Sequence, residues 1–488
     1  MSRGGSTSPA SAVSPTASRQ LAEWCAGLQW RDVPDAVRAH LPLRLLDTTG
    51  LILAGARTPA AQAALALAQA SGGAPQSSLC GNAGVRLPAA AAALVHGTAA
   101  HCRDFDDTFV DSVVHPGSVV IPTALAVAEA VSASNEEFGT ALIAGYEVAA
   151  RIGAVAGRRF HARHLHATGV VGPLAAAATA GRLMRLSGEQ IAWAMGLAAS
   201  MSGGLMAFTI DGGWSKWLHA GWAAHGGIVA AELAARGFRG PGHVLDGGQD
   251  LYSALLHGEA VERSALTGDL GGRWRGALAQ FKYYPCAHVI QPYIDAVIEL
   301  VTRHNLRAAD IDAIECAIAP WAAAIVAEPR EAKLRFDSEL EAIASLPYQL
   351  AVAVAEGGVG LRALEAGQRA RADIAALAQR ITHRSDPDLG RSFDGEVSLR
   401  TTSGAQYVQA ALTAGIDAAK LRAKFLRNVT PVMDRQHGAA DAAAAAMALA
   451  AAAALLTPGA PDWRAAAAML RDASPAASPA PASTTTAA

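Results

Sequence analysis

The segment from His101 to His115 concentrates side chains that can carry acid–base or metal chemistry. It begins with the sequence HCRDFDDT, which contains Asp104, and it ends where His115 opens the sequence HPGS. Only 17% of the chain is charged, and charged groups are costly to bury unless they are paired, hydrogen-bonded or used. The segment therefore predicts a metal site, a surface loop or the acid–base wall of an active site.

A metal site is the first alternative. The aspartates between Asp106 and Asp111 resemble the Mg²⁺ motif of the all-helical terpene synthases, but the sequence has no second metal motif and only 5% aromatic residues. A zinc or iron site built on His101, Asp104 and His115 needs a further ligand at helical or hairpin spacing. We therefore expect no metal, and the alternative for the aspartates alone is that they cap a helix and bind loop amides.

Other chemistry-bearing residues are scattered along the chain. The sequence HARHLHATG places His166 before an apolar helix, and the N-terminus of a helix favours an anion. Lys216, in SKWLHAGW, has no acidic partner within the next turn, and Lys282 lies in the apolar sequence FKYYPCAH. A lysine in such a setting either extends outward or meets an anionic ligand. Tyr348 opens an apolar helix, where core packing is the simplest alternative role.

The composition predicts a mainly α protein. The chain has 488 residues, is 51% hydrophobic and is rich in Ala, which favours closely packed helices. We predict a large all-helical domain with an inserted smaller α+β lid domain, in which 311–318 is a strand and 394–410 a hairpin. The predicted order is a disordered leader at 1–16, the first part of the helical domain at 17–270, the α+β lid domain at 271–405, a helical C-terminal return at 406–460 and a largely disordered tail at 461–488.

Charge and motif content exclude several functions. The net charge is −2 and no basic stripe is present, so we expect no nucleic-acid partner. The apolar run at 442–456 is too short to favour a membrane span. Five widely spaced cysteines are typical of a reducing compartment, so we expect a cytoplasmic protein. The sequence contains neither a G-x-G-x-x-G nor a G-x-x-x-x-G-K-[ST] motif, so we expect no nucleotide cofactor.

Six segments, in order along residues 18–455, resemble the MmgE/PrpD family. They are HCRDFDDT with HPGSVVIPTALAVAEA, GYEVAARIG, HATGVVGPLAAAATAGRLM, KWLHAGWAAHGGIVAAELAARGFRGP, FKYYPCAH and SLPYQLAVA. The resemblance implies a helical domain with an α+β lid, an active site between the two, a homodimer, and no metal or organic cofactor. Members act on di- and tricarboxylates as dehydratases, decarboxylases or epimerases.

The resemblance also implies a site. Its catalytic residues would be His115, Asp104, Lys216 and Tyr348, and its substrate-binding residues Thr108, His166 and Lys282. The lysines and His166 could neutralise substrate carboxylates and stabilise enolate-like charge. His115 would move the proton at carbon, Asp104 would orient a histidine or hold a substrate hydroxyl, and Tyr348 would donate from the lid.

We therefore predict a cofactor-independent lyase, either 2-methylcitrate dehydratase-like or cis-aconitate decarboxylase-like. An epimerase or isomerase of a carboxylate on the same scaffold is one alternative, and a non-catalytic helical scaffold is another. A scaffold has no need of two lysines without acidic neighbours. The spacing from Thr108 to His115 is one residue longer than in the decarboxylases, and Phe109 replaces a common His or Trp, so the substrate itself stays open.

Overall fold

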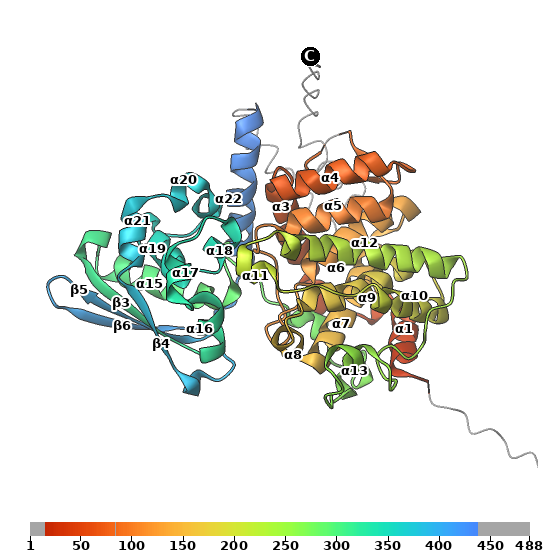
Figure 1. The fold of residues 1–488 in the computed structure, drawn as a ribbon. Coiled ribbons are helices and arrows are strands. Elements are labelled where there is room, and N and C mark those ends of the chain that lie inside the picture. Colours follow the sequence, from red (N-terminus) through yellow and green to blue (C-terminus); the bar gives the residue numbers. More distant parts are fainter. Residues whose placement is uncertain (1–14, 83, 438–488) are drawn as a thin grey trace, which may run out of the picture.

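The computed structural model describes residues 15–82 and 84–437. The predicted leader, except for its last two residues, the apolar run at 442–456 and the predicted tail all lie outside the described residues. Figure 1 shows a large helical body and a smaller α+β body, with the C-terminal helix standing between them. The mainly helical fold with an α+β lid is therefore confirmed.

Long helices build the larger body. They are α1 (Ala17–Gly27), α3 (Leu41–Gly55), α4 (Pro59–Ser71), α5 (Ala89–His101), α6 (Gly117–Val131), α7 (Asn135–Ala156), α9 (Ala167–Leu183), α10 (Gly188–Ser200) and α12 (Ser215–Ala235). Short elements join them: α2 (Asp35–Arg38), α8 (Arg159–Ala162), α11 (Phe208–Asp211), α13 (Leu251–Leu255), α14 (Ser264–Thr267) and the small ribbon of β1 (Ser77–Ser78) and β2 (Arg86–Leu87).

Local sequence explains where these helices begin and how closely they pack. The Ser187 hydroxyl accepts from the Gln190 amide and the Gln190 side chain accepts from the Ser187 amide, so α10 starts at a capping box. Helix α12 crosses α5 at glycines, because a Cβ added at Gly97 would lie 2.7 Å from the Gly221 Cα. The small residues of α12 thus let neighbouring helices approach its backbone closely. This packing fixes the position of α12, which carries Lys216.

The lid has its own sheet and core. Its strands are β3 (Ile311–Ile318), β4 (Ile381–Ser385), β5 (Gly395–Thr401) and β6 (Gln406–Ala411), in the order β4-β3-β5-β6. Strands β3 and β4 run parallel, and the other pairs are antiparallel. The lid helices are α15 (Gln291–Arg303), α16 (Pro320–Val326), α17 (Arg330–Leu334), α18 (Glu339–Ile343), α19 (Leu346–Glu356), α20 (Ala366–Arg369) and α21 (Ala372–Ala378).

The lid sheet extends past residue 405, where the sequence places the end of the lid domain. Gly395 of β5 pairs with Ala411, so the second strand of the hairpin runs through residues that we had assigned to the helical return. The strand pattern of 394–410 and the domain boundary were inconsistent predictions, and the backbone pairing follows the strand pattern.

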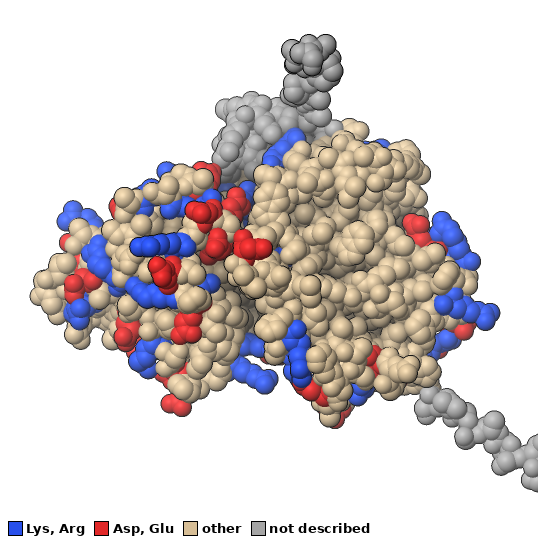
Figure 2. Space-filling model, in the orientation of Figure 1, with Lys and Arg blue, Asp and Glu red and all other residues tan. Residues whose placement is uncertain are grey.

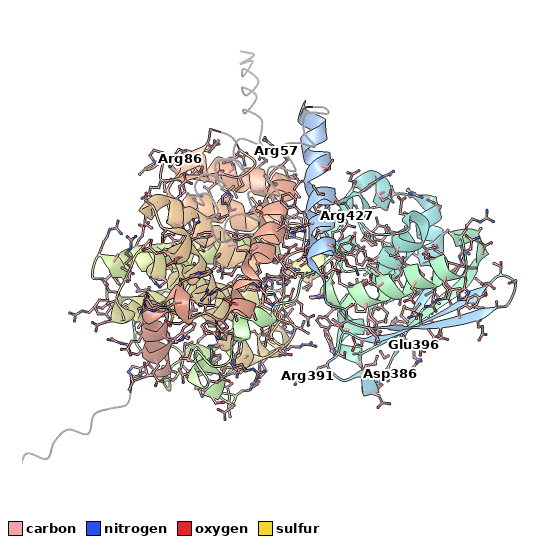
Figure 3. The ribbon with its side chains drawn as sticks, turned by 180° about the vertical axis from the view of Figure 1, so that it is seen from behind. Arg57, Arg86, Asp386, Arg391, Glu396 and Arg427 are labelled. Atoms are coloured by element: carbon pink, nitrogen blue, oxygen red, sulfur yellow. The ribbon has the colours of Figure 1, made fainter. Side chains whose placement is uncertain are left out.

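Helix α22 (Ala418–His437) carries the chain back to the helical body. Its Phe425 lies so close to α3 that a Cβ at Gly50 would come within 2.6 Å of the ring. Lys424 forms a fully buried ion pair with Asp47 at 2.5 Å and donates to the Phe105 carbonyl at 2.7 Å. On the lid side, Arg427, labelled in Figure 3, donates to the Tyr283 carbonyl at 2.6 Å. The helix therefore holds segments of both bodies.

Among the described residues, one helix, α7, is long and apolar enough to cross a membrane. Of its apolar window, 94% is buried inside the protein. The bent pair formed by residues Asp35–Gly55 and Pro59–Ser71 also passes if it is counted as one span. Burial of this kind is expected of a core helix in a large helical domain.

Replacing Lys424 by Met should destabilise the fold by about 3–5 kcal/mol, because Asp47 would be left as a buried carboxylate without its cation. Burial already raises the pKa of Asp47 to about 6, against the opposing effect of Lys424. Urea denaturation checks this, with Lys420→Met, an exposed lysine of the same helix, as the matched control. The double variant Asp47→Leu/Lys424→Met should recover most of the loss. A Lys424→Met protein within 1 kcal/mol of wild type would refute the assignment.

Candidate active site

The loop between α5 and α6 carries the residues singled out between His101 and His115. Asp104 adopts a positive φ of 47°, a conformation that aspartate tolerates better than most side chains. Beyond it, the backbone of Thr108 exchanges two hydrogen bonds with that of Gln280, both at 2.8 Å. This antiparallel bridge ties the loop to the chain entering the lid and brings Lys282 next to Asp104.

Asp104 joins the two predicted lysines. Its Oδ2 lies 2.5 Å from the Lys216 Nζ, and its Oδ1 accepts from the Lys282 Nζ at 2.9 Å. Lys282 also donates to the Asp104 carbonyl at 2.8 Å. Burial opposes ionisation of this carboxyl, but Lys216 and then Lys282 hold its pKa well below the usual range. Burial likewise lowers the pKa of Lys216, against the opposing effect of Asp104.

This pairing differs from the role inferred for Asp104 from sequence. The carboxylate neither orients a histidine nor stands free for a substrate hydroxyl: it neutralises lysines that have no acidic neighbour nearby in sequence. Lys282 lies 178 positions away from its partner. Local inspection of the sequence could not reveal such a pair.

Asp106 performs the histidine-orienting task instead. Its Oδ2 accepts from the His101 Nδ1 at 2.9 Å, and its Oδ1 lies 3.5 Å from the His115 Nδ1. The same His115 nitrogen lies 3.1 Å from the Thr108 hydroxyl. With Nδ1 so occupied, the Nε2 of His115 is the nitrogen left to meet a substrate. The sequence alone did not indicate these contacts of Asp106.

Electrostatics keep His115 neutral in this arrangement. Burial lowers its pKa well below the ordinary value, with Asp106 opposing and Lys282 adding to the effect. Burial also works against ionisation of Asp106, but His101 and then His115 lower its pKa. At neutral pH the pair therefore consists of an ionised carboxylate and an uncharged imidazole, which can accept a proton.

His166 brings a second group of imidazoles to the same place. It caps α9, and its backbone amide donates to the Gly204 carbonyl at 2.8 Å. Its Nδ1 lies 3.0 Å from the Nδ1 of His219, which lies three residues after Lys216 and so on the same face of α12. The ring centroid of His166 lies 5.6 Å from that of His101 and 6.1 Å from that of His115.

Three helices begin at this cluster. His115 precedes α6, His166 is the residue before α9, and Lys216 is the second residue of α12. Helix N-termini carry partial positive charge and favour anions. The Asp107 carboxylate accepts from the Gly117 amide at 2.8 Å and pairs with Arg44 at 2.6 Å, so it serves the fold, as predicted. Together these helix ends and the lysines suit a negatively charged ligand.

Tyr348 does not join the cluster in this structure. Its hydroxyl donates to the Ala363 carbonyl at 2.5 Å, its ring meets that of Phe336, and it belongs to the lid core. Burial raises its pKa to about 12, and the charged groups that act on it all belong to the lid. The other predicted site residues are brought together: Asp104, Thr108, His115, His166, Lys216 and Lys282.

The lid docks beside the site. Arg103, next to Asp104, forms an ion pair with Glu339 of α18 at 2.7 Å. Leu340 packs in a small apolar cluster with Phe208 and with Trp217 of α12. The region that holds Asp104 and Lys216 is thus adjacent to the contact between the two bodies, as the predicted site between helical domain and lid requires.

One group of three side chains has the composition of a metal site. One ligand atom from each of His101, Asp106 and His115 lies within 4.8 Å of the others, and two imidazoles with a carboxylate form a common zinc-ligand set. The same contacts are those of a carboxylate that orients two histidines. Asp104, which the sequence offered as a ligand, is instead paired with two ammonium groups. That no metal is needed stays a prediction.

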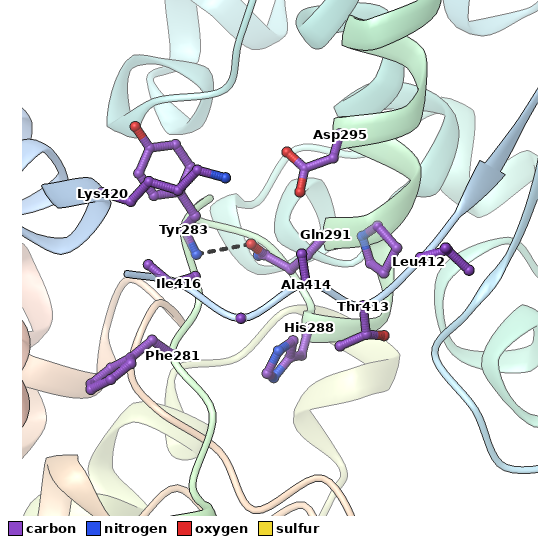
Figure 4. Close-up of a pocket in the computed structure, with 12 residues that line it drawn as sticks. Phe281, Tyr283, His288, Gln291, Asp295, Leu412, Thr413, Ala414, Ile416 and Lys420 are labelled. Carbon is purple, nitrogen blue, oxygen red and sulfur yellow. Dashed lines mark hydrogen bonds between the residues drawn. The ribbon is translucent and has the colours of Figure 1, made fainter. Parts of the chain in front are cut away.

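Two signals in the sequence could have extended the predicted site. Only five of the 40 basic residues are lysines, and Lys216, Lys282 and Lys424 are all at or beside the cluster, so lysine itself marks the region. The second is His288, at the end of FKYYPCAH. Figure 4 shows it lining a pocket with Gln291 beneath the chain that leaves β6. Burial and then Lys282 lower its pKa to about 3.

The fold and the site define a two-domain, mainly helical protein with a buried, cation-rich centre suited to carboxylates. Comparison with known families agrees: the MmgE/PrpD N-terminal domain matches residues 19–264 and the MmgE/PrpD C-terminal domain matches residues 284–448. The chain therefore belongs to the MmgE/PrpD family, which confirms the resemblance drawn from the six sequence segments.

Several similar proteins are named as cis-aconitate decarboxylases or as proteins like them. The chain is 25% identical to cis-aconitate decarboxylase of Mus musculus over 431 residues, 84% of this chain and 86% of that protein. It is 33% identical to the Homo sapiens enzyme of the same name over 228 residues, but that match spans only 45% of this chain and 46% of the human protein. A cis-aconitate decarboxylase-like protein of Aspergillus oryzae is 28% identical over 58% of this chain and 61% of its own length.

The neutral histidines predict a fold that weakens in acid. Burial lowers the pKa of His161 and of His219 to about 4, whereas an unfolded histidine titrates near ~6.5. Below pH 6.5 the unfolded chain binds more protons than the folded one, so stability present at pH 7.5 is lost as the pH falls. The loss at pH 5.0 is about 2 kcal/mol for a buried histidine such as His161.

Urea denaturation at pH 7.5 and pH 5.0 measures this loss. In His161→Asn the difference between the two pH values should shrink by about 2 kcal/mol. His164→Asn is the matched control, because His164 is exposed and its positive φ of 58° suits asparagine. Equal pH dependence in wild type and His161→Asn would contradict the assignment.

Proposed function

We propose that this protein is a cofactor-independent lyase that removes CO₂ or water from a di- or tricarboxylate by moving a proton at carbon next to a carboxylate. The observation that carries the proposal is the buried junction of Lys216 and Lys282 at Asp104, with His115 close by. The names of the relatives favour decarboxylation of cis-aconitate as the first reaction to test.

The two lysines supply the binding chemistry. One carboxylate cannot satisfy all the donors of two ammonium groups, since each –NH₃⁺ has three. A substrate carboxylate can therefore join the Lys216 and Lys282 ammonium groups while Asp104 stays in place. Removal of CO₂ or of a proton leaves electron density on the neighbouring carbon and carboxylate, and fixed cations stabilise that charge more as it develops.

His115 moves the proton. With Nδ1 facing Thr108 and Asp106, its Nε2 can abstract a proton from carbon in a dehydration, because the imidazole is neutral. In a decarboxylation the C–CO₂ bond breaks, and a proton must replace the lost CO₂ at carbon. The negative charge of a bound polycarboxylate raises the pKa of a nearby histidine, so the substrate itself helps to make His115 a proton donor.

Tyr348 keeps its predicted role only as a proposal. In the present structure its hydroxyl is engaged within the lid by Ala363. A contribution to chemistry requires the lid to shift and present this hydroxyl to the substrate, which fits a lid that contacts the helical body through small clusters such as the Arg103–Glu339 pair.

We also propose a homodimer in a reducing, cytoplasmic setting. The helical body in Figure 2 presents a broad face with few charged side chains, whereas the lid is covered with them. Large apolar side chains are exposed along α12 at intervals of four residues, namely Trp214, Leu218 and Trp222, each 44–50% exposed. A face of this kind is typical of a protein–protein contact. Cys25, Cys102, Cys286 and Cys316 are buried free thiols, which supports a reducing compartment.

Proton NMR in D₂O tests the reaction. Chelator-treated protein is incubated with cis-aconitate, 2-methylcitrate and related polycarboxylates, and loss of CO₂ or water with deuterium incorporated at carbon is expected. Deuterium exchange with inversion and no leaving group would replace the lyase by the epimerase. No exchange or turnover with any compound would favour the non-catalytic scaffold. Activity lost on chelation and restored by Mg²⁺ would contradict a metal-independent reaction.

Lys216→Met and His115→Gln should each lower kcat/KM on the substrate so identified by about 10²-fold or more, the scale of a lost charge-stabilising contact or acid–base group. Steady-state kinetics check this, with Lys420→Met as a surface-lysine control that retains wild-type rates. A Lys216→Met or His115→Gln enzyme with unchanged kcat/KM would refute the assigned role.

A further inference from the structure

The imidazoles of His166 and His219 form a directly hydrogen-bonded pair. Their Nδ1 atoms lie 3.0 Å apart, so one ring donates its proton and the other accepts it. His166 is 2% exposed, and its Nε2 is buried without a hydrogen-bond partner among the described residues. A buried imidazole nitrogen left without a partner is costly and marks a place where a ligand group can bind.

Other unpartnered nitrogens border the pair. The ring of His161 lies 6.0 Å from that of His166, edge to face, and the ring of His101 is stacked at 5.6 Å. Within the described part of the chain, the Nδ1 of His161 and the Nε2 of His101 are also buried and lack partners. Three imidazoles at one point thus have an unused nitrogen, which no ordinary packing role explains.

The elements packed against the His166–His219 pair contribute charged and titratable groups that face it. Lys216 of α12, His101 at the end of α5 and His161 before α9 all disfavour a positive charge on His166. Arg158 acts on His161 in the same sense. The carboxylates of Asp104 and Asp106 in the loop already have partners. Asp104 is paired with the two lysines, and Asp106 is paired with His101 and His115.

Consequently the surroundings hold the pair uncharged. Burial, followed by His101 and Lys216, lowers the pKa of His166 well below its usual value, and burial lowers that of His219 to about 4. The junction of Lys216 and Lys282 at Asp104 has one net positive charge, which is too little for a ligand that carries several carboxylates. Burying such a ligand without a matching positive charge is strongly unfavourable.

We propose that the His166–His219 pair is a second carboxylate subsite, which takes up one proton from solvent when a substrate carboxylate binds beside the Nε2 of His166. The new proton is bound at that Nε2 and is donated to the carboxylate, while the Nδ1 proton of His166 is donated to His219. An N–H bond forms at His166 as hydronium or the buffer acid releases its proton, and no covalent bond of the ligand changes. The proposal rests on the proposed function, because it takes the ligand to be a di- or tricarboxylate, and it adds proton uptake to binding.

Isothermal titration calorimetry with tricarballylate tests the proposal without turnover, because this saturated tricarboxylate has no hydroxyl to lose and no double bond. Titrations of the full-length protein at pH 7.5 in phosphate, HEPES and Tris give the proton number from the dependence of the observed enthalpy on buffer ionisation enthalpy. We expect uptake of about one proton, and a Kd that weakens about tenfold from pH 6.5 to pH 7.5.

Two variants locate the proton. His166→Asn keeps an amide that can hydrogen-bond but removes the ring that takes up the proton, so proton uptake should fall towards zero and the Kd should become nearly independent of pH. His164→Asn, in the same histidine-rich segment but exposed, should retain the wild-type proton number. Thermal melting of each variant shows whether it is folded, and the wild-type proton number decides the matter even if His166→Asn is not.

The outcomes separate this proposal from the proposed function. Tricarballylate binding by wild type with no proton uptake overturns the proton-linked subsite and leaves the lyase standing. Undiminished uptake in folded His166→Asn also overturns it, because the proton must then bind elsewhere. No binding by wild type at millimolar tricarballylate overturns the proposed function and the subsite together.

Discussion

The active centre depends on one buried carboxylate that holds two lysines, one of them buried and the other with its side chain 12% exposed. Asp104 brings together Lys216, from the start of α12, and Lys282, from the strand-like chain that enters the lid. Without this carboxylate two like charges would lie close together in a region of low dielectric, which is strongly unfavourable. The pairing therefore allows the protein to store positive charge where a substrate carboxylate can use it.

Much of the fold supports this junction. The bridge between Thr108 and Gln280 aligns the two chain segments, and the glycines of α12 fix the helix that carries Lys216. Helix α22 returns from the lid and binds the Phe105 carbonyl through Lys424, next to Asp104. The neutral histidines complete the centre, because burial lowers the pKa of His115 and of His166 well below the ordinary value.

The sequence predicted the elements well wherever the signal was local. The strand at 311–318 and the hairpin at 394–410 both occur as expected. The lid boundary at 405 was wrong because it ignored the pairing partner of β5, although the hairpin pattern itself extended further.

The site could be predicted as a set of residues but not as a set of contacts. Family segments identified Asp104, His115, His166, Lys216 and Lys282, and the fold brings them together. Which carboxylate contacts which base is decided by tertiary packing across as many as 178 positions, so the sequence could not assign the partners of Asp104 and Asp106. Whether Tyr348 reaches the site depends on how the lid is placed, and the identity of the residue does not encode that placement.

The most direct test of the account is a crystal structure of the protein with tricarballylate bound. The account predicts one ligand carboxylate about 3 Å from the Nζ of Lys216 or Lys282, with Asp104 still between the two lysines. A ligand bound elsewhere, or both lysines engaged by Asp104 alone at saturating tricarballylate, would contradict the claim that this junction is built to bind a carboxylate substrate.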